Sequence, residues 1–296
     1  MVAQPVQNKP KPCPICGAPT APAGQKRGRR TGRMFILRKC GGCGFAFVEE
    51  PWTDYARIYD EAYYRGGGSD PLVDYEFEMS DPDRTIRRYE WAGIEKIVGS
   101  LAPGPVTWLD FGSGNGGLVR HLRARGYDHA FGHDHGAWAA KARAAGIPIL
   151  DDSELELHAG TFDVITAIEV LEHVVDPLET LRRLRRMAKP GALLFVTTGN
   201  AAAAPGDLCT WAYVEPEIHV SYFTPKSLAL AMTACGFEPF HPGRVLGWTD
   251  IIRFKLLKNL RVRRTNACER VMPWPFISRL LDRKYRFSAQ PAGRAV

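Results

Sequence analysis

The feature that most constrains the fold of this 296-residue chain is an apolar run that ends in an acid and continues into alternate glycines. Residues 106–111 (VTWLDF) have the composition of a β-strand, Gly112, Gly114 and Gly116 follow at every second position, and residues 117–125 have helical spacing. Glycine lets a backbone turn tightly and approach a ligand closely, and a helix start presents N–H groups without intrahelical partners. The order strand, glycine loop, helix therefore predicts a site for a nucleotide-like ligand.

The acids around this loop narrow the identity of the ligand. Asp110 precedes the first glycine in the spacing Asp-x-Gly-x-Gly-x-Gly, which differs from the Gly-x-Gly-x-x-Gly of dinucleotide-binding folds. A carboxylate here would repel a pyrophosphate and suits a ligand with a positively charged ammonium group. Asp134 follows the next predicted strand, where it can accept both ribose hydroxyls, and Asp151 or Asp152 follows the third, within reach of an adenine amino group. We predict S-adenosylmethionine as the cofactor, with these candidate contacts: Asp110, Gly112, Ser113, Gly114, Asn115, Gly116, Asp134, Asp151, Asp152 and Glu169.

Four of the seven cysteines form two Cys-x-x-Cys pairs, each followed by glycine: Cys13 with Cys16, and Cys40 with Cys43. This spacing is typical of a zinc ribbon, in which four thiolates close a tetrahedral structural site. Iron in a rubredoxin-like site uses the same ligands and remains an alternative. Free thiolates of this kind indicate a reducing compartment, and the N-terminus has no apolar signal-peptide core, so we expect a cytoplasmic protein.

Beyond the loop the chain alternates between short apolar runs and helical segments. Strand character appears at 129–133, 147–150, 162–168 and 192–198, and helical character at 136–145, 177–189 and 225–235. This alternation predicts an α/β fold: a Rossmann-like sheet flanked by helices, with a small N-terminal zinc ribbon. The expected segments are a disordered tail (1–12), the ribbon (13–48), a helical linker or lid (49–100), the S-adenosylmethionine-binding domain (101–250) and a basic C-terminal extension (251–296) whose end, 288–296, is disordered.

Residues from about 86 to 240 resemble the class I S-adenosylmethionine-dependent methyltransferases. The motifs that carry the resemblance are LDFGSGNG (109–116), FDVI (162–165), EVLEHV (169–174), KPGAL (189–193) and HVSYFTPKSL (219–228). Together with the ribbon, they resemble a zinc-ribbon group that methylates sugars, glycans, natural products or quinone precursors. The resemblance implies a seven-stranded sheet with a reversed last strand, although no clean pair of closing strands is recognisable after Phe237.

Catalysis of methyl transfer requires alignment, exclusion of water and, for a hydroxyl acceptor, a base. His219 is our preferred base, because it lies in a long irregular stretch, 199–224, of the kind that forms a substrate lid. Related sugar C-methyltransferases place a histidine in a similar His-x-x-Tyr-Phe setting; the alternative is that His219 only anchors the loop or caps the next helix. Glu172 and His173 are further catalytic candidates. Glu169, Glu172 and His173 also resemble the cluster that binds a divalent ion in quinone-pathway O-methyltransferases.

The function we predict is O- or C-methylation of a small-molecule, sugar or glycan, or quinone-like acceptor. Basic residues between the cysteine pairs, such as Lys26, Arg29 and Arg30, favour an alternative, an rRNA or protein methyltransferase whose ribbon contacts the macromolecule. Against it, no Asn-Pro-Pro-Tyr-type motif follows the fourth predicted strand. A third hypothesis is a non-catalytic binding module that retains the fold.

The C-terminal extension mixes apolar residues with many arginines and lysines, within a chain of net charge +7. We favour a final strand and helix packed on the core. The other interpretation is a peripheral surface that lies on an anionic membrane, which would suit a lipid-linked acceptor. No apolar run approaches the roughly 20 residues that span a bilayer.

Overall fold

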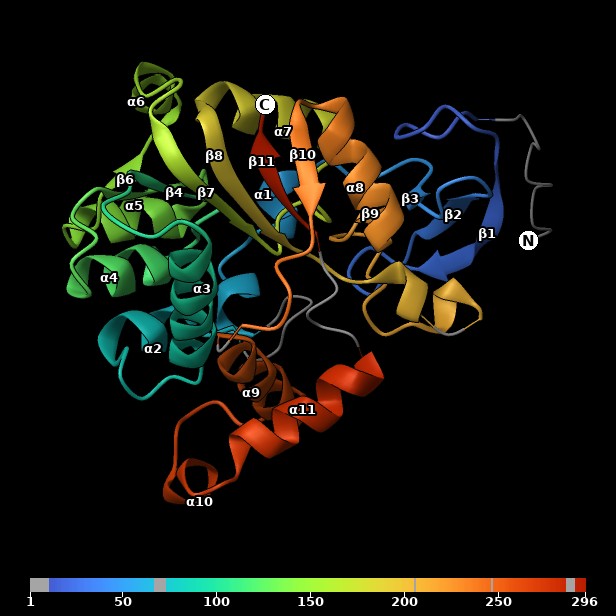
Figure 1. Ribbon diagram of the computed structural model, residues 1–296. Helices are drawn as coiled ribbons and strands as arrows, with labels where there is room; N and C mark the ends of the chain where they lie inside the picture. The colour runs from blue at the N-terminus through green and yellow to red at the C-terminus, as the bar shows by residue number, and fades with distance from the viewer. Residues whose placement is uncertain (1–10, 67–72, 205, 246, 286–290) are drawn as a thin grey trace.

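The computed structural model describes residues 11–66, 73–204, 206–245, 247–285 and 291–296 (Figure 1). At its centre is a seven-stranded sheet in the order β10-β11-β8-β7-β4-β5-β6. The strands are β4 (Trp108–Phe111), β5 (Ala130–His133), β6 (Ile149–Leu150), β7 (Phe162–Ile168), β8 (Ala188–Thr197), β10 (Phe237–Phe240) and β11 (Ala292–Ala295). Strands β4 to β8 pair in parallel, and β11 runs antiparallel to both neighbours. The Rossmann-like sheet with a reversed last strand is thereby confirmed.

The closing strand β11 corrects one prediction. We expected residues 288–296 to be disordered, but Ala292–Ala295 insert between β10 and β8; residues 288–290 lie outside the described part of the chain. The segment Ala-Gly-Arg-Ala has none of the β-branched or aromatic side chains that indicate a strand. Its two alanines are nevertheless buried, and the guanidinium of Arg294 donates to the carbonyl oxygen of Leu101 at 2.6 Å. The last residues of the predicted extension therefore belong to the central sheet.

Helices cover both faces of this sheet (Figure 1). One face carries α3 (Arg87–Leu101), α4 (Gly117–Ala124), α5 (Ala137–Ala144) and α9 (Gly247–Asn259), and the other α6 (Asp152–Leu157), α7 (Pro177–Met187) and α8 (Pro225–Ala234). Neighbouring residues of β7 enter different cores, since Val164 packs with α3 and α4 and Ile165 with α7 and α8. Such burial on both faces is typical of parallel strands. Helices α3 and α9 meet at glycines: a Cβ on Gly93 would lie 2.8 Å from the carbonyl oxygen of Gly247.

The ribbon forms a second sheet of four strands, in the order β1-β2-β3-β9. Three strands come from the N-terminal segment: β1 (Thr20–Arg27), β2 (Met34–Cys40) and β3 (Ala46–Val48). The fourth, β9 (Ser221–Tyr222), comes from the predicted substrate lid and pairs antiparallel with β3. The ribbon and the lid are therefore parts of one sheet.

The linker and the C-terminal segment are mainly helical. The linker contains α1 (Tyr55–Ile58), a 3-10 turn at Tyr63–Arg65 and α2 (Tyr75–Ser80), and the lid contains 3-10 turns at Ala201–Ala203 and Leu208–Thr210. After α9 the chain forms α10 (Ala267–Arg270) and α11 (Trp274–Tyr285), and α11 packs on α9. The predicted tail 1–12 is described only from Lys11, and Pro12 forms a β-bridge with Pro19. Within the described ranges, no helix is both long and apolar enough to cross a bilayer.

Candidate functional site

The glycine loop joins β4 to α4 and has the backbone that its sequence predicts. Gly112, Gly114 and Gly116 have φ values of 76°, 56° and 71°, in the left-handed region that side chains disfavour. There is also no room for a side chain at these glycines. A Cβ on Gly112 would lie 2.4 Å from Val170 Cγ2, and one on Gly114 would lie 2.6 Å from Tyr75 Oη. Both the conformation and the close contacts require glycine at these positions.

Polar groups at the loop are buried. Asp110 accepts a hydrogen bond from Thr166 Oγ1 at 2.8 Å, and burial raises the pKa of its carboxyl to about 7. Asn115 Nδ2 donates to Glu78 Oε2 at 2.9 Å. Among the described residues, the hydroxyl of Ser113 is buried and has no hydrogen-bond partner. An orphaned hydroxyl beside a glycine loop at a helix start fits a polar ligand such as S-adenosylmethionine.

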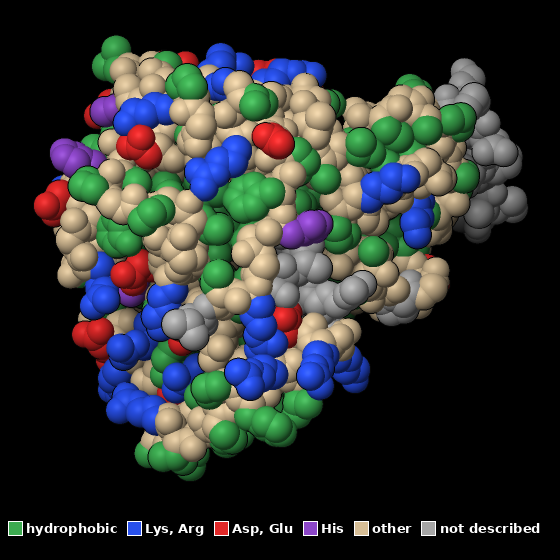
Figure 2. Space-filling view, in the orientation of Figure 1, with side chains coloured by type: hydrophobic (Ala, Val, Ile, Leu, Met, Phe, Trp, Pro, Cys, Tyr) green, Lys and Arg blue, Asp and Glu red, His purple; other side chains and the backbone are tan. Residues whose placement is uncertain are grey.

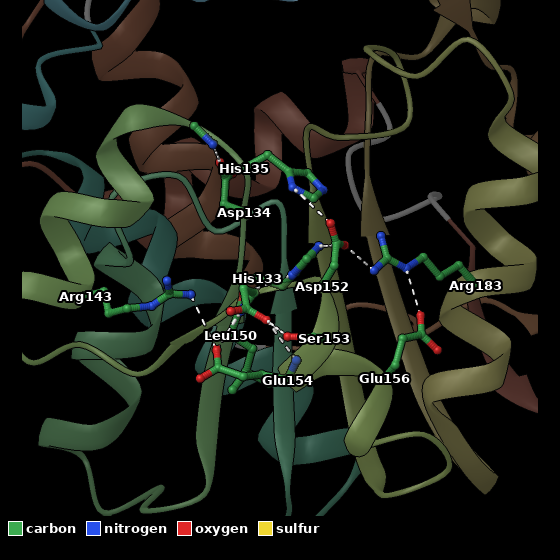
Figure 3. Close-up of polar contacts among 12 residues, drawn as sticks. His133, Asp134, His135, Arg143, Leu150, Asp152, Ser153, Glu154, Glu156 and Arg183 are labelled. Carbon is green, nitrogen blue, oxygen red and sulfur yellow. Dashed lines mark hydrogen bonds and ion pairs between the residues drawn. The ribbon is translucent and has the colours of Figure 1, made fainter.

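Asp134 ties the loop to the next strand–helix junction. Its Oδ2 accepts from the N–H of Gly114 at 2.9 Å, and its Oδ1 accepts from the N–H of Gly136 at 2.6 Å. Figure 3 shows Asp134 next to His135. Each carboxylate oxygen has a second lone pair, so these bonds still allow it to accept ribose hydroxyls. The ribose-binding role of Asp134 stays a prediction, with which these two bonds are compatible.

The two acids predicted for adenine have other partners, and Figure 3 shows those of Asp152. Asp151 is the N-cap of α6 and forms a capping box with Glu154. Asp152 binds the guanidinium of Arg183 at 2.5 Å and lies 3.6 Å from the imidazoles of His133 and His135. Both carboxylates are thus already engaged by protein groups. That either of them contacts adenine stays a prediction.

The EVLEHV motif places two carboxyl groups with opposite pKa shifts after β7. Glu169 has φ 53°, unusual for a residue with a side chain, and accepts from Thr197 Oγ1 and Lys255 Nζ, each at 3.2 Å. Burial alone would raise its pKa, but the nearby Lys255 and Lys258 lower it to about 2. The pKa of Glu172 rises to about 8, because the group is buried and lies near Glu169. At neutral pH Glu169 is therefore ionised and Glu172 protonated.

His173 and His219 face each other beside these acids, with ring centroids 4.8 Å apart. His173 Nδ1 lies 3.2 Å from both Tyr59 Oη and the carbonyl oxygen of Ile218, and burial together with His219 lowers its pKa to about 3. His219 Nδ1 lies 2.7 Å from the carbonyl oxygen of Tyr213. A carbonyl can only accept, so Nδ1 of His219 carries a proton, and in the neutral imidazole the lone pair is on Nε2.

A different trio from the one predicted has the geometry to hold a metal ion. Ligand atoms of Glu172, His173 and His219 lie within 4.8 Å of one another. The carboxylate of Glu169 is instead bonded to Lys255. Carboxylate and imidazole donors fit a divalent ion.

Three contacts of this site were missed in the sequence. Tyr213 donates to Glu172 at 2.6 Å and stacks on His219 at 4.3 Å, Tyr59 lies against His173, and Lys255 neutralises Glu169. The density of aromatic residues in the lid and linker was a signal for the two tyrosines. No signal in the sequence indicated the contact of Lys255, because it depends on how α9 packs.

The four ribbon cysteines come together as predicted. Cys13 Sγ lies 3.6 Å from Cys43 Sγ, Cys16 Sγ lies 3.5 Å from Cys40 Sγ, and all four lie within 4.8 Å of one another. Sulfurs at ~2.3 Å around a tetrahedral zinc ion are separated by ~3.8 Å, whereas a disulfide would bring them to ~2.05 Å. The backbone N–H groups of Gly42 and Cys43 point at Cys40 Sγ at 3.3 and 3.4 Å, as expected around a thiolate ligand. The donor set fits a structural zinc ion.

Comparison with known proteins finds methyltransferases, the family that the motifs of this chain resemble. A family model described as a methyltransferase domain matches residues 84–241. The ubiquinone biosynthesis O-methyltransferase of Hahella chejuensis is 38% identical over 102 residues, 31% of this chain and 42% of that protein. Its namesake from Cronobacter sakazakii is 32% identical over 158 residues, 48% of this chain and 58% of that protein. Each match thus spans less than two thirds of the relative.

One solved structure is also matched over part of the chain. An S-adenosylmethionine dependent methyltransferase from Mesorhizobium loti is 18% identical with a TM-score of 0.42, over 60% of this chain and 96% of that one.

Proposed function

Because this chain belongs to the family of methyltransferase domains, we propose that it methylates a hydroxyl or carbon of a small-molecule, sugar or quinone-like acceptor, with S-adenosylmethionine as the donor. When bound, the donor supplies a methyl group already activated on a sulfonium. Support for this cofactor comes from the glycine loop, Asp134 and the orphaned hydroxyl of Ser113. The protein has then to align the acceptor and take up its proton.

His219 is the base that we propose, and the observation that carries this choice is its bond to the Tyr213 carbonyl. That bond leaves the lone pair on Nε2. The neighbouring groups are less suitable. Glu172 is protonated at neutral pH, Glu169 is neutralised by Lys255, and the pKa of His173, about 3, makes it a weak base.

The surroundings of His219 favour a planar acceptor. Trp211 and Tyr213 stack with ring centroids 4.8 Å apart, and Tyr213 stacks on His219. Aromatic faces bind flat rings through offset stacking. A phenol or a reduced quinone has both the flat ring and the acidic hydroxyl that such a site could use, and the curated relatives act in ubiquinone biosynthesis.

The nucleic-acid alternative is weakened by the partners of the ribbon cations. Lys26 Nζ donates to the carbonyl oxygen of Trp211 at 3.1 Å, Arg29 pairs with Glu215 at 2.9 Å, and Arg30 pairs with Asp60. These groups are engaged within the chain, and the charges of Arg29 and Arg30 are partly neutralised by their acidic partners.

The experiment begins with calorimetry of S-adenosylmethionine binding. Transfer of a labelled methyl group is then measured to a panel of catechols and reduced quinones, to sugars, and to rRNA. We expect saturable binding and transfer to a phenolic or sugar hydroxyl. Transfer to rRNA alone would replace the proposal with the nucleic-acid alternative, and absence of S-adenosylmethionine binding would favour a non-catalytic module.

We also propose that the protein contacts an anionic membrane surface through the segment 260–284. Its exposed side chains include Val271 (83% exposed), Phe276 (63%) and Leu280 (51%). Its two acids, Glu269 and Asp282, are buried, whereas its cations at 261, 263, 264, 270, 279, 283 and 284 are exposed. In Figure 2, Lys and Arg side chains and hydrophobic side chains gather over the lower lobe, where α9 to α11 lie in Figure 1. Apolar side chains surrounded by cations suit an anionic bilayer.

Vesicle flotation tests this surface. The protein should float with phosphatidylglycerol vesicles and much less with phosphatidylcholine vesicles. Phe276→Glu should lower the bound fraction by roughly tenfold, because it removes the burial of one large apolar side chain. Leu157→Glu, at an even more exposed position on α6 (85%), is the control outside the segment. Equal binding of both variants would show that the segment is only a solvated face.

A further inference from the structure

The tip of the β1–β2 hairpin encloses the carboxylate of Glu217, a lid residue. The N–H groups of Arg30 and Thr31 donate to its two oxygens at 2.9 and 2.7 Å, and Thr31 Oγ1 donates at 2.6 Å. The fit leaves no room for another side chain, because a Cβ on Gly28 would lie 2.4 Å from the Glu217 carboxyl carbon. Glu217 is 2% exposed.

These bonds favour the charged form of Glu217. Burial would raise its pKa, but the hydroxyl of Thr31 and the N–H groups of the hairpin lower it below its usual value. Hydrogen bonds to a buried carboxylate are among the stronger ones in proteins. The hairpin tip therefore holds Glu217 firmly.

The ribbon also holds the lid on the other side of His219. Val48 N–H donates to the carbonyl oxygen of Val220 at 2.9 Å, and Ala46 and Phe47 of β3 pair with Tyr222 and Ser221 of β9. Val220 N–H in turn donates to the carbonyl oxygen of Glu172 at 2.7 Å. The ribbon thus contacts Glu217, two residues before His219, and Val220, directly after it.

The turn that carries His219 is short and is fixed by its own bonds. His219 N–H donates to the carbonyl oxygen of Glu215 at 2.8 Å, and its Nδ1 donates to that of Tyr213. If Glu217 moved, the turn between Tyr213 and His219 would lose its anchor, and the imidazole would lose the carbonyl that fixes its tautomer.

We infer that Glu217, held by the ribbon hairpin through Thr31, is a positioning residue that keeps the imidazole of His219 in the Nδ1-protonated tautomer. This inference rests on the proposed function, in which His219 is the base. It gives the ribbon a role in shaping the acceptor site.

Nitrogen-15 NMR of the imidazole rings tests the inference without an acceptor, with the His219 signals identified by their absence in His219→Gln. In the full-length zinc-loaded protein we expect a single Nδ1-protonated tautomer. Glu217→Ala should lose this signature and give a mixture of tautomers, whereas Glu217→Gln, which keeps one acceptor oxygen, should be intermediate. Zinc content and S-adenosylmethionine affinity, measured in parallel, report whether each variant is folded.

Two Thr31 variants keep the test decisive if Glu217→Ala does not fold. Thr31→Val removes the hydroxyl donor and should shift the tautomer in the same direction, and Thr31→Ser keeps it and should match the wild type. Glu215→Gln, which weakens the ion pair with the exposed Arg29 but keeps the backbone carbonyl that binds the N–H of His219, is a further control. An unchanged His219 tautomer in a folded Glu217→Ala or Thr31→Val protein would overturn the inference. If instead the tautomer shifts but His219 variants retain full methyl transfer, the positioning holds and the proposed base is wrong.

Discussion

The Nδ1 nitrogen of His219 donates its proton to the carbonyl oxygen of Tyr213 across 2.7 Å. This bond fixes which nitrogen of the ring can accept a proton from an acceptor molecule. The same tyrosine donates its phenolic hydrogen to Glu172 at 2.6 Å and stacks on the imidazole. One residue of the lid therefore orients both the candidate base and a protonated acid beside it.

Replacing His219 should slow catalysis and leave cofactor binding intact. We expect His219→Ala to lower turnover by ~10²–10⁴-fold, the usual contribution of a positioned general base. The measurement is labelled methyl transfer to the acceptor that the panel identifies, with calorimetry of S-adenosylmethionine as the second readout. His241→Ala, at an exposed histidine, should behave as the wild type. Wild-type turnover of His219→Ala would assign the residue to the structure of the loop.

Removing the Asp134 carboxylate should weaken cofactor binding. Asp134→Ala loses the acceptors for the N–H groups of Gly114 and Gly136 as well as the predicted ribose contact. We expect at least about a tenfold rise in the dissociation constant, since one lost charge-assisted hydrogen bond is worth about 1.5–3 kcal/mol. Asp128→Ala, an exposed acid nearby in sequence, is the control. Unchanged affinity in calorimetry would remove Asp134 from the ribose role.

Local patterns predicted β4, the glycine loop and α4, because strand composition, glycine spacing and helical periodicity all lie within 20 residues of each other. The spacing of the four cysteines likewise predicted their cluster. Contacts between distant segments were not predicted. β9 completes the ribbon sheet from the lid, and Lys255 reaches Glu169 from α9, and neither pairing leaves a periodic signal in the sequence. β11 was missed because alanine and glycine resemble a loop.

Loss of one ribbon cysteine should remove the metal. We expect about one zinc ion per chain in the wild type and little in Cys13→Ser, because a structural site needs all four ligands. Metal analysis of the purified proteins measures this. Cys268→Ser, an exposed single cysteine, should keep full zinc content. Undiminished zinc in Cys13→Ser would refute the ribbon site, and iron in its place would identify a rubredoxin-like centre.

The stability of the protein should depend on pH through Glu172. Its pKa is raised from the usual 4.5 to about 8 in the fold, so the folded state keeps a proton that the unfolded state releases. The contribution of Glu172 to stability is complete below about pH 4.5 and is lost as the pH rises through about 8.

Glu172→Gln imitates the protonated acid and should not show this loss. Between pH 5 and 8 the unfolding free energy of the wild type should fall relative to the variant, by at most about 1.4 kcal/mol per pH unit. Glu169, whose pKa is about 2, stays ionised in this range, and the low pKa of His173 affects both proteins alike. Urea unfolding at several pH values measures the difference, and parallel curves for the two proteins would show that Glu172 is ionised in the native state.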